Sequence, residues 1–257
     1  GHMDWIIALV ALTAMEIVLG IDNIVFLAIL ADKLPKEQQA KARTLGLAAA
    51  LIMRVLLLLG ISWIMGLTKP LIDVSTMGLN PEWFGEHGAE MLTVSGRDLI
   101  MMAGGLFLIG HSVKEILDAA RDGTEKRAPT SGRQATFASV ITQIALGDII
   151  FSLDSVITAV GMAEDVRVMI TAIVFAIGVM MLAAGPISRF VSSHPTVKVL
   201  ALSFLILIGV MLVAEAIGTH INKGYVYFAM AFSLVVELIN MRVRPVPLPH
   251  TLPAVSE

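Results

Sequence analysis

The feature that most constrains this chain is a long stretch without charge, which runs from Val168 to Ser188. A helix needs about 20 residues to cross the hydrocarbon core of a bilayer, and this stretch is long enough to do so. Over the whole sequence, hydrophobic residues make up 56% and charged residues 15%, whereas a soluble domain carries roughly 25% charged residues. The sequence therefore predicts an integral membrane protein.

Seven segments are apolar enough to cross the membrane as helices. They cover residues 5–31, 44–67, 98–118, 136–162, 168–189, 197–217 and 225–242. An outer-membrane barrel is excluded, because its segments of about 10 residues alternate between apolar and polar positions. We expect an all-α membrane protein with one transporter-like domain over 4–243. Residues 1–3 have the sequence of an expression remnant, and the proline-rich tail over 244–257 is expected to be disordered.

The loops indicate how the chain is oriented in the membrane. Lysine and arginine gather in the loops after the first, third and fifth segments and in the tail, while the other loops carry few of them. Because basic residues accumulate on the cytoplasmic side, we expect the N-terminus outside and the C-terminus inside. The chain has no cysteine, which excludes disulfides and thiolate metal sites, and its net charge of -3 gives no reason to expect nucleic acid.

An acidic pattern occurs in both the first and the fourth segment. In each copy an acid is followed six positions later by a second acid, and then by a small hydrogen-bonding residue. The two copies are Glu16-Ile-Val-Leu-Gly-Ile-Asp22-Asn23 and Asp148-Ile-Ile-Phe-Ser-Leu-Asp154-Ser155. An odd number of spans separates the copies, so they run in opposite directions through the membrane, as in transporters built from inverted repeats. We predict two three-helix repeats, over 4–118 and 136–217, and an extra helix over 225–242.

Acids inside membrane segments are costly and need a physical reason. Each costs roughly 2.5–3.5 kcal/mol at the bilayer centre on insertion scales. A purely structural explanation would pair them with buried bases, and Arg54 could neutralise one, but the acids outnumber the bases. We predict instead that the two copies supply metal ligands, namely Glu16, Asp22, Asn23, Asp148, Asp154 and Ser155. The candidate accessory residues or charge partners are Arg54, His111, Lys114, Glu115, Gln143, Glu215 and Glu237.

The residue types of this set indicate a hard divalent cation. Carboxylate, amide and hydroxyl oxygens suit Mg²⁺, Ca²⁺ and Mn²⁺ better than copper or zinc. Carboxylates close together cannot all stay ionised without a cation, so an exchange of metal for protons is a natural hypothesis. Glu16 and Asp22 lie on different faces of a regular helix, because six residues rotate by about 240°. We therefore expect helix breaks at Gly20 and Gly147. Small residues also predict close helix contacts at Gly104–Gly105 and at Ala183-Ala184-Gly185, within one chain or between two.

The two acidic copies resemble the signature segments of the TerC family of bacterial inner-membrane proteins. The resemblance includes Asp32-Lys-Leu-Pro35 and Gly104-Gly-Leu-Phe-Leu-Ile109, and it covers about 4–242. It implies a seven-helix fold in the bacterial inner membrane and, for several members, manganese export or homeostasis. It also implies functional roles for Glu16, Asp22, Asn23, Asp148, Asp154 and Ser155. The family name refers to tellurite resistance, which an acidic site does not explain chemically.

Two functions from different classes fit these features. The first is a transporter that exports a hard divalent cation, Mn²⁺ before Ca²⁺ or Mg²⁺, by alternating access and with proton exchange as a further option. The second is a membrane scaffold in a metal or tellurite stress response, without flux of its own. An intramembrane enzyme ranks last, because the chain has no HExxH or GxSxG motif. We expect no prosthetic group. The expected partners are the lipid bilayer, the cation and protons, and a homo-oligomer stays open.

Overall fold

The computed structural model describes residues 2–74, 80, 82–83, 88–122, 136–162, 166–219 and 221–243. The chain divides into two compact units, Gly1–Asn222 and Lys223–Glu257. Within the described residues, six helices are long and apolar enough to cross a membrane, and Phe137–Leu153 is a shorter apolar helix. The six are Trp5–Asp32, Lys36–Leu59, Gly96–Arg121, Val166–Ser193, Pro195–Ala216 and Lys223–Val243. The expected helical membrane protein is thus confirmed, and the apolar stretch Phe137–Leu153 is the first part of the helix Phe137–Met162, which lies at the fourth expected span.

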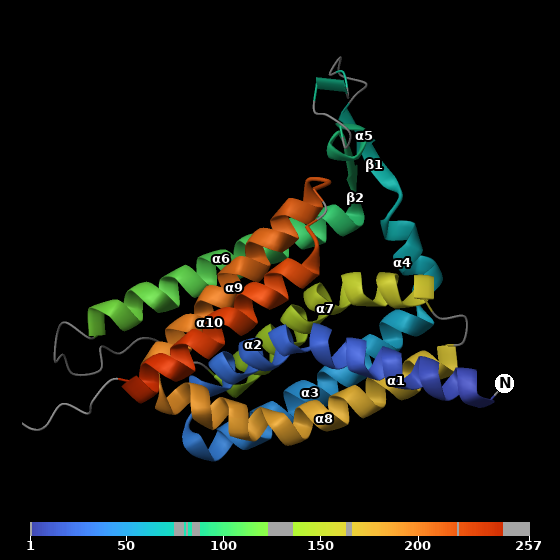
Figure 1. Ribbon diagram of the computed structural model, residues 1–257. Helices are drawn as coiled ribbons and strands as arrows, with labels where there is room; N and C mark the ends of the chain where they lie inside the picture. The colour runs from blue at the N-terminus through green and yellow to red at the C-terminus, as the bar shows by residue number, and fades with distance from the viewer. Residues whose placement is uncertain are drawn as a thin grey trace, which may run out of the picture. The chain divides into compact units, whose positions relative to one another are not determined.

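The described part of the first unit is mainly helical (Figure 1). Its elements in chain order are α1 (His2–Leu19), α2 (Ile21–Asp32), α3 (Lys36–Leu59), α4 (Ile61–Leu67), β1 (Pro70–Asp73), α5 (Gly88–Met91), β2 (Thr93–Ser95), α6 (Gly96–Asp122), α7 (Phe137–Met162), α8 (Val166–Ser193) and α9 (Pro195–Ala216). The second unit contains α10 (Lys223–Val243), which matches the expected span over 225–242.

Glycine interrupts the first span but not the fourth. α1 ends just before Gly20 and α2 begins just after it, so the structure interrupts the helix at this predicted position. Helical hydrogen bonds still cross it, from the Gly20 N–H to the Glu16 carbonyl over 2.8 Å and from the Ile24 N–H to the Gly20 carbonyl over 3.1 Å, so the interruption covers a single residue. The predicted break at Gly147 is wrong, because α7 continues through this position. Gly147 faces Phe26 of α2, and a Cβ added here would collide with that ring. The glycine therefore allows a close approach between two helices, which is the other common reason for a glycine in a membrane helix.

The second span begins earlier than expected. α3 starts at Lys36, directly after Pro35, and not at residue 44. Its first turns consist largely of Lys, Glu, Gln and Ala, which are good helix formers, so the helix continues beyond its apolar part. Gly60 then ends α3, and α4 extends the span to Leu67.

A short two-stranded sheet, which we did not expect from the sequence, lies between the second and third spans. β1 pairs antiparallel with β2, and Ile72 is opposite Val94. The sheet leads directly into α6, whose start is fixed by Ser95 and Asp98. The backbone N–H and the hydroxyl of Ser95 donate to the Asp98 carboxylate over 2.8 and 2.6 Å, and the Asp98 N–H donates back to the Ser95 hydroxyl over 3.2 Å. This reciprocal pattern satisfies donors that a helix start leaves unpaired.

A close contact between helix backbones joins the third and sixth spans. A Cβ built on Gly105 of α6 would lie 2.7 Å from the carbonyl oxygen of Gly209 in α9, and a Cβ built on Gly209 would lie 2.8 Å from the carbonyl oxygen of Gly105. The neighbouring Gly104 packs against Ile150 of α7. The predicted close contact at Gly104–Gly105 is confirmed, and it lies within one chain. The predicted contact at Ala183-Ala184-Gly185 is not seen at Gly185, where an added Cβ would meet only Arg189 of the same helix at 3.6 Å.

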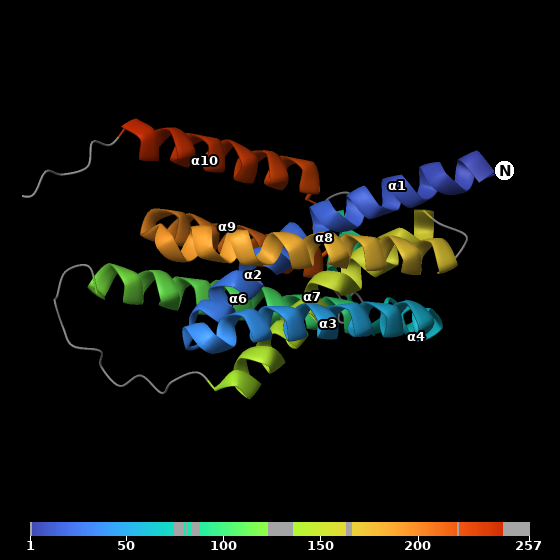
Figure 2. The same ribbon diagram turned by 90° about the horizontal axis from the view of Figure 1, so that it is seen from below.

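The other long helices of the first unit lie beside this pair, and α2, α7 and α8 contact it. α1 and α2 lie against α8, and α3 lies against α7 and α8 (Figure 2). The large side chains that are fully buried inside include Phe26, Leu30, Leu58, Met101, Leu153, Met180 and Leu202. The outward side chains are apolar too, with Leu182 80% and Ile7 63% exposed. A helix that is apolar on all sides belongs in a membrane or a large core.

Candidate functional site

Three buried charges meet inside the first unit. Nη1 of Arg54, in α3, donates to Oε2 of Glu16 in α1 over 2.9 Å. Nη2 and Nε of the same guanidinium donate to Oδ1 of Asp148 in α7 over 3.1 and 3.3 Å. The three side chains are between 2% and 4% exposed. Arg54 therefore bridges the first acids of both acidic copies, whereas the sequence led us to expect that it would pair with one acid.

Two neutral side chains complete the surroundings of Asp148. The amide of Asn23 in α2 donates from Nδ2 to Oδ1 of Asp148 over 3.0 Å, and the hydroxyl of Ser152 donates to Oδ2 over 3.2 Å. Hydrogen bonds to an ionised acceptor are about twice as strong as neutral ones. Ser152 was missed by the sequence reasoning. It follows Asp148 by four positions, and residues four apart share a helix face, so this spacing could have found it.

The local sequence around Gly20 places three polar groups of the first acidic copy in the interior. Glu16 precedes the break and Asn23 follows it. The two are seven positions apart, which returns them to about the same side of the helix axis. Both contact the cluster around Arg54. Asp22 is also buried, in the first turn of α2, where the helix dipole favours a negative charge.

The cluster carries more negative than positive charge. Glu16 and Asp148 share the single guanidinium of Arg54, so with both acids ionised this triad has one negative charge in excess. The Oδ1 atom of Asn23 is buried and accepts no hydrogen bond from any described residue. A buried oxygen without a hydrogen-bond donor lowers the stability of the folded protein by about 1–3 kcal/mol, because nothing replaces its lost hydration. The excess charge and the unpartnered oxygen both favour a second cation.

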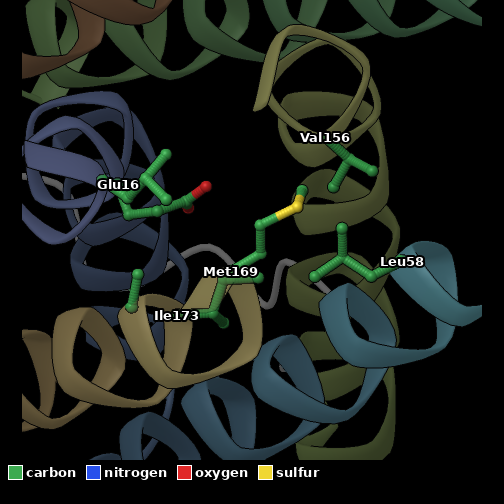
Figure 3. A pocket seen from close by; sticks show the side chains of 7 residues that line it. Glu16, Leu58, Val156, Met169 and Ile173 are labelled. Atoms are coloured by element: carbon green, nitrogen blue, oxygen red, sulfur yellow. The ribbon is translucent and has the colours of Figure 1, made fainter. Parts of the chain in front are cut away.

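A small cavity lies beside Glu16 (Figure 3). Its volume is about 10 Å³, which is close to the space that one water needs. The carboxylate of Glu16 points into it, and the other walls are apolar. The lining residues are Leu12, Glu16, Leu58, Val156, Met169, Ala172 and Ile173. There is thus room for one water or one bare ion next to the carboxylate.

The predicted ligands do not all meet in this state. Glu16, Asn23 and Asp148 come together at Arg54, but the described side chains include no group of three or more His, Cys, Asp or Glu residues that could hold a metal ion. Asp154 and Ser155 belong to α7, and their side chains lie outside those that the structure describes. The guanidinium lies between the carboxylates that a shared metal ion would contact.

Several predicted charge partners lie elsewhere. Glu115 of α6 pairs over 2.5 Å with Lys33, which directly follows α2, and Glu215 of α9 pairs with Arg97 of α6 over 3.5 Å. Both pairs join helices and lie outside the cluster at Arg54. Lys114 is exposed and forms no ion pair within the described part of the chain.

The remaining candidates also lie outside the cluster. His111 contacts the rings of Phe26 and Phe107, with ring centroids 6.4 and 5.8 Å apart. Gln143 donates to Ser139, one turn earlier in its own helix. Glu237 belongs to α10 in the second unit.

Comparison with known proteins places the chain in a family. The family model described as "Integral membrane protein TerC family" matches residues 2–246. A "UPF0053 protein" of Haemophilus influenzae is 52% identical over 238 residues, which cover 93% of this chain and 94% of that protein. The "UPF0053 inner membrane protein YgdQ" of Escherichia coli strain K12 is 49% identical over 235 residues, covering 91% of this chain and 92% of that protein.

A longer relative matches the same region. The "UPF0053 inner membrane protein YoaE" of Escherichia coli strain K12 is 50% identical over 239 residues, which cover 92% of this chain but 42% of that protein. No solved structure matches the chain. The chain is therefore a multi-pass inner membrane protein and belongs to the TerC family of integral membrane proteins.

Proposed function

We propose that this protein moves a hard divalent cation across the inner membrane, and that Glu16, Asn23 and Asp148 bind the cation in the loaded state. The observation that carries the proposal is the buried charge excess, since two carboxylates share one guanidinium. An uncompensated charge inside a protein costs several kcal/mol. A cation from outside the chain would remove this cost.

The donor atoms fit a hard ion. The cluster offers carboxylate oxygens from Glu16 and Asp148, the hydroxyl of Ser152 and the amide oxygen of Asn23, which has no described partner. Mg²⁺, Ca²⁺ and Mn²⁺ prefer oxygen ligands of this kind. We put Mn²⁺ first because the family resemblance implies manganese export for several members. Asp22, Asp154 and Ser155 are the further ligands that we propose for the loaded state.

Arg54 and a bound cation would compete for the carboxylates of Glu16 and Asp148. Its guanidinium donates to the carboxylate oxygens that a cation would need, so ion and guanidinium compete for the same atoms. Added to the intact triad, a divalent ion would also change its net charge from minus one to plus one, so we propose that loading moves Arg54 away from at least one carboxylate. The loaded protein then differs in structure from the state described here, and two states of this kind are what alternating access needs.

The helix packing supports inverted repeats as the framework of the cycle. The first span (α1 and α2) packs against α8, which is the fifth span, and α3 of the second span packs against α7, the fourth. The third and sixth spans, α6 and α9, pack against each other. A twofold axis that exchanges spans one to three with spans four to six turns the contact between spans one and five into the contact between spans four and two. The same axis turns the contact between spans three and six into itself. We propose the N-terminus outside and the C-terminus inside, from the basic loops.

The direct test is cation flux in proteoliposomes. The parent protein, Asp148→Asn and the matched control Asp32→Asn are reconstituted, and Mn²⁺ entry is followed with an enclosed indicator. Asp32 is an acid at the end of α2 that pairs with Lys198 over 3.3 Å and lies outside the cluster. We expect flux in the parent and in Asp32→Asn, and its loss in Asp148→Asn. A folded parent that moves none of Mn²⁺, Ca²⁺ and Mg²⁺ would refute the proposal.

One observation favours the scaffold as a second candidate. Arg54 already bonds both carboxylates, so the triad holds three helices together without any added ion. A buried polar cluster can serve to fix one arrangement of helices, although this has to be tested for each protein. If the protein is only a scaffold, we expect no Mn²⁺ flux and no stabilisation by Mn²⁺. If it is a transporter, we expect Mn²⁺ flux and also stabilisation by Mn²⁺, because a ligand of the folded state raises its stability by mass action.

A further inference from the structure

We propose that a pocket between α3 and α8 binds the phosphate of an anionic phospholipid. The pocket has a volume of about 120 Å³. Its walls come from the first half of α3 and the second half of α8, and they are formed by Ala40, Arg43, Thr44, Leu47, Met181, Ala184 and Gly185. It lies outside the cluster at Arg54, and the proposal is independent of cation transport.

Two arginines border this pocket. Arg43 lines it, and its Nη1 donates one long hydrogen bond of 3.5 Å to the Ser188 hydroxyl. Arg189 reaches over Gly185, because its Nη1 lies 3.6 Å from the position that a Gly185 Cβ would take. Arg43 donates to Ser188, which directly precedes Arg189 in α8, so both arginines lie at the same end of the pocket. Neither forms an ion pair with a described residue, and no acid lines the pocket.

This charge arrangement suits a shared anion. Two like charges held close together disfavour one another unless an opposite charge lies between them. The guanidinium is a planar fork of donors that matches phosphate oxygens in pairs, which is why arginine is frequent at phosphate sites. Arg43 has donors left over, since Ser188 accepts from one of its nitrogens.

The depth of the pocket favours a lipid over a free phosphate. Arg189 is the first charge after the uncharged stretch of α8, and Arg43 is the last charge before the uncharged part of α3 that begins at Thr44. The two arginines thus mark the same border of the apolar region, where phospholipid headgroups lie. From this border Leu47 and Met181 continue the wall with apolar side chains. Basic pockets between membrane helices bind anionic headgroups in this way.

The experiment uses the full chain in a neutral detergent and follows its thermal unfolding as phosphatidylglycerol is added. Phosphatidylcholine and inorganic phosphate are added in parallel. Each basic residue near a membrane surface changes anionic-lipid binding by about fivefold. We expect Arg43→Gln combined with Arg189→Gln to shift the phosphatidylglycerol concentration for half-maximal stabilisation upward by roughly 25-fold.

The matched control is Lys36→Gln combined with Lys41→Gln, which removes the same charge from exposed positions of α3 that do not line the pocket. A second test variant, Gly185→Leu, fills the pocket and keeps the charge, and an added Cβ there meets the Arg189 guanidinium at an ordinary 3.6 Å. We expect Gly185→Leu to lose the phosphatidylglycerol effect and the lysine control to keep it.

Three results would overturn the proposal. The first is an unchanged phosphatidylglycerol response in folded Gly185→Leu, which decides the question even when the double arginine variant does not fold. The second is an equal loss in the lysine control, which would mean a diffuse surface charge effect. The third is an equal stabilisation of the parent by inorganic phosphate, which would mean a soluble anion as the occupant.

Discussion

Replacing Arg54 with Gln tests the central feature of the cluster. The substitution removes the guanidinium that bonds Glu16 over 2.9 Å and Asp148 over 3.1 Å, and it leaves two buried carboxylates without their base. Removing one partner of a buried ion pair costs about 3–5 kcal/mol, because the other charge stays buried and unpaired. We therefore expect the free energy of unfolding in cation-free buffer to fall by about 3–5 kcal/mol, a large part of the 5–15 kcal/mol that holds a typical domain folded.

Equilibrium unfolding in detergent, with a chelator present, measures this change. The control is Lys198→Gln, which breaks a pair with Asp32 of 3.3 Å whose side chains are 32% and 23% exposed. Pairs this open to solvent contribute about 0–1 kcal/mol. The difference between the two variants therefore separates a buried charge effect from the simple loss of one positive charge.

Adding Mn²⁺ separates the two proposed functions. If the guanidinium competes with the ion, its removal frees oxygens of Glu16 and Asp148, and Mn²⁺ should stabilise Arg54→Gln more than the parent. A concentration 100 times the dissociation constant raises stability by about 2.7 kcal/mol. If the free energy of unfolding without Mn²⁺ falls no more in Arg54→Gln than in Lys198→Gln, the energetic argument is refuted. Equal Mn²⁺ effects in variant and parent would refute the competition.

Three further predictions concern packing and ligand chemistry. Gly105→Ala should lower the melting temperature because the added Cβ meets backbone, whereas Gly110→Ala, with nothing within 4 Å of its Cβ, should be neutral or stabilising. Gly147→Ala should cost about 1–3 kcal/mol by overpacking, and a double-mutant cycle should show that Phe26→Leu recovers part of this loss. Asn23→Asp places a second carboxylate where an amide now donates over 3.0 Å, so unfolding measurements should show a loss of about 1–3 kcal/mol without Mn²⁺ and a recovery with it.

The parts of the fold that the sequence predicted are those that depend on local composition. Span positions follow from apolar runs, and a glycine such as Gly20 weakens its own helix. The role of Gly147 could not be found in this way, because it depends on a ring at Phe26, which is far away in the sequence. The same limit applies to Arg54. Counting bases against acids assigned it one partner, but only the folded arrangement of α1, α3 and α7 brings both Glu16 and Asp148 to its guanidinium.

The position of Arg54 makes the two proposed repeats unequal. Arg54 belongs to the second span, and its counterpart after an exchange of halves would lie in the fifth span, which is uncharged from Val168 to Ser188. The repeats therefore supply similar acids but share one base. When the two halves exchange conformations, the fifth span offers no buried arginine that could take the place of Arg54. In that second conformation, another cation must therefore neutralise the buried carboxylates. An ion that arrives as Arg54 leaves, and departs as it returns, would balance the charge in both states. We infer that the single buried arginine couples occupancy of the site to its conformation, and that a symmetric site without it would bind a cation without this coupling.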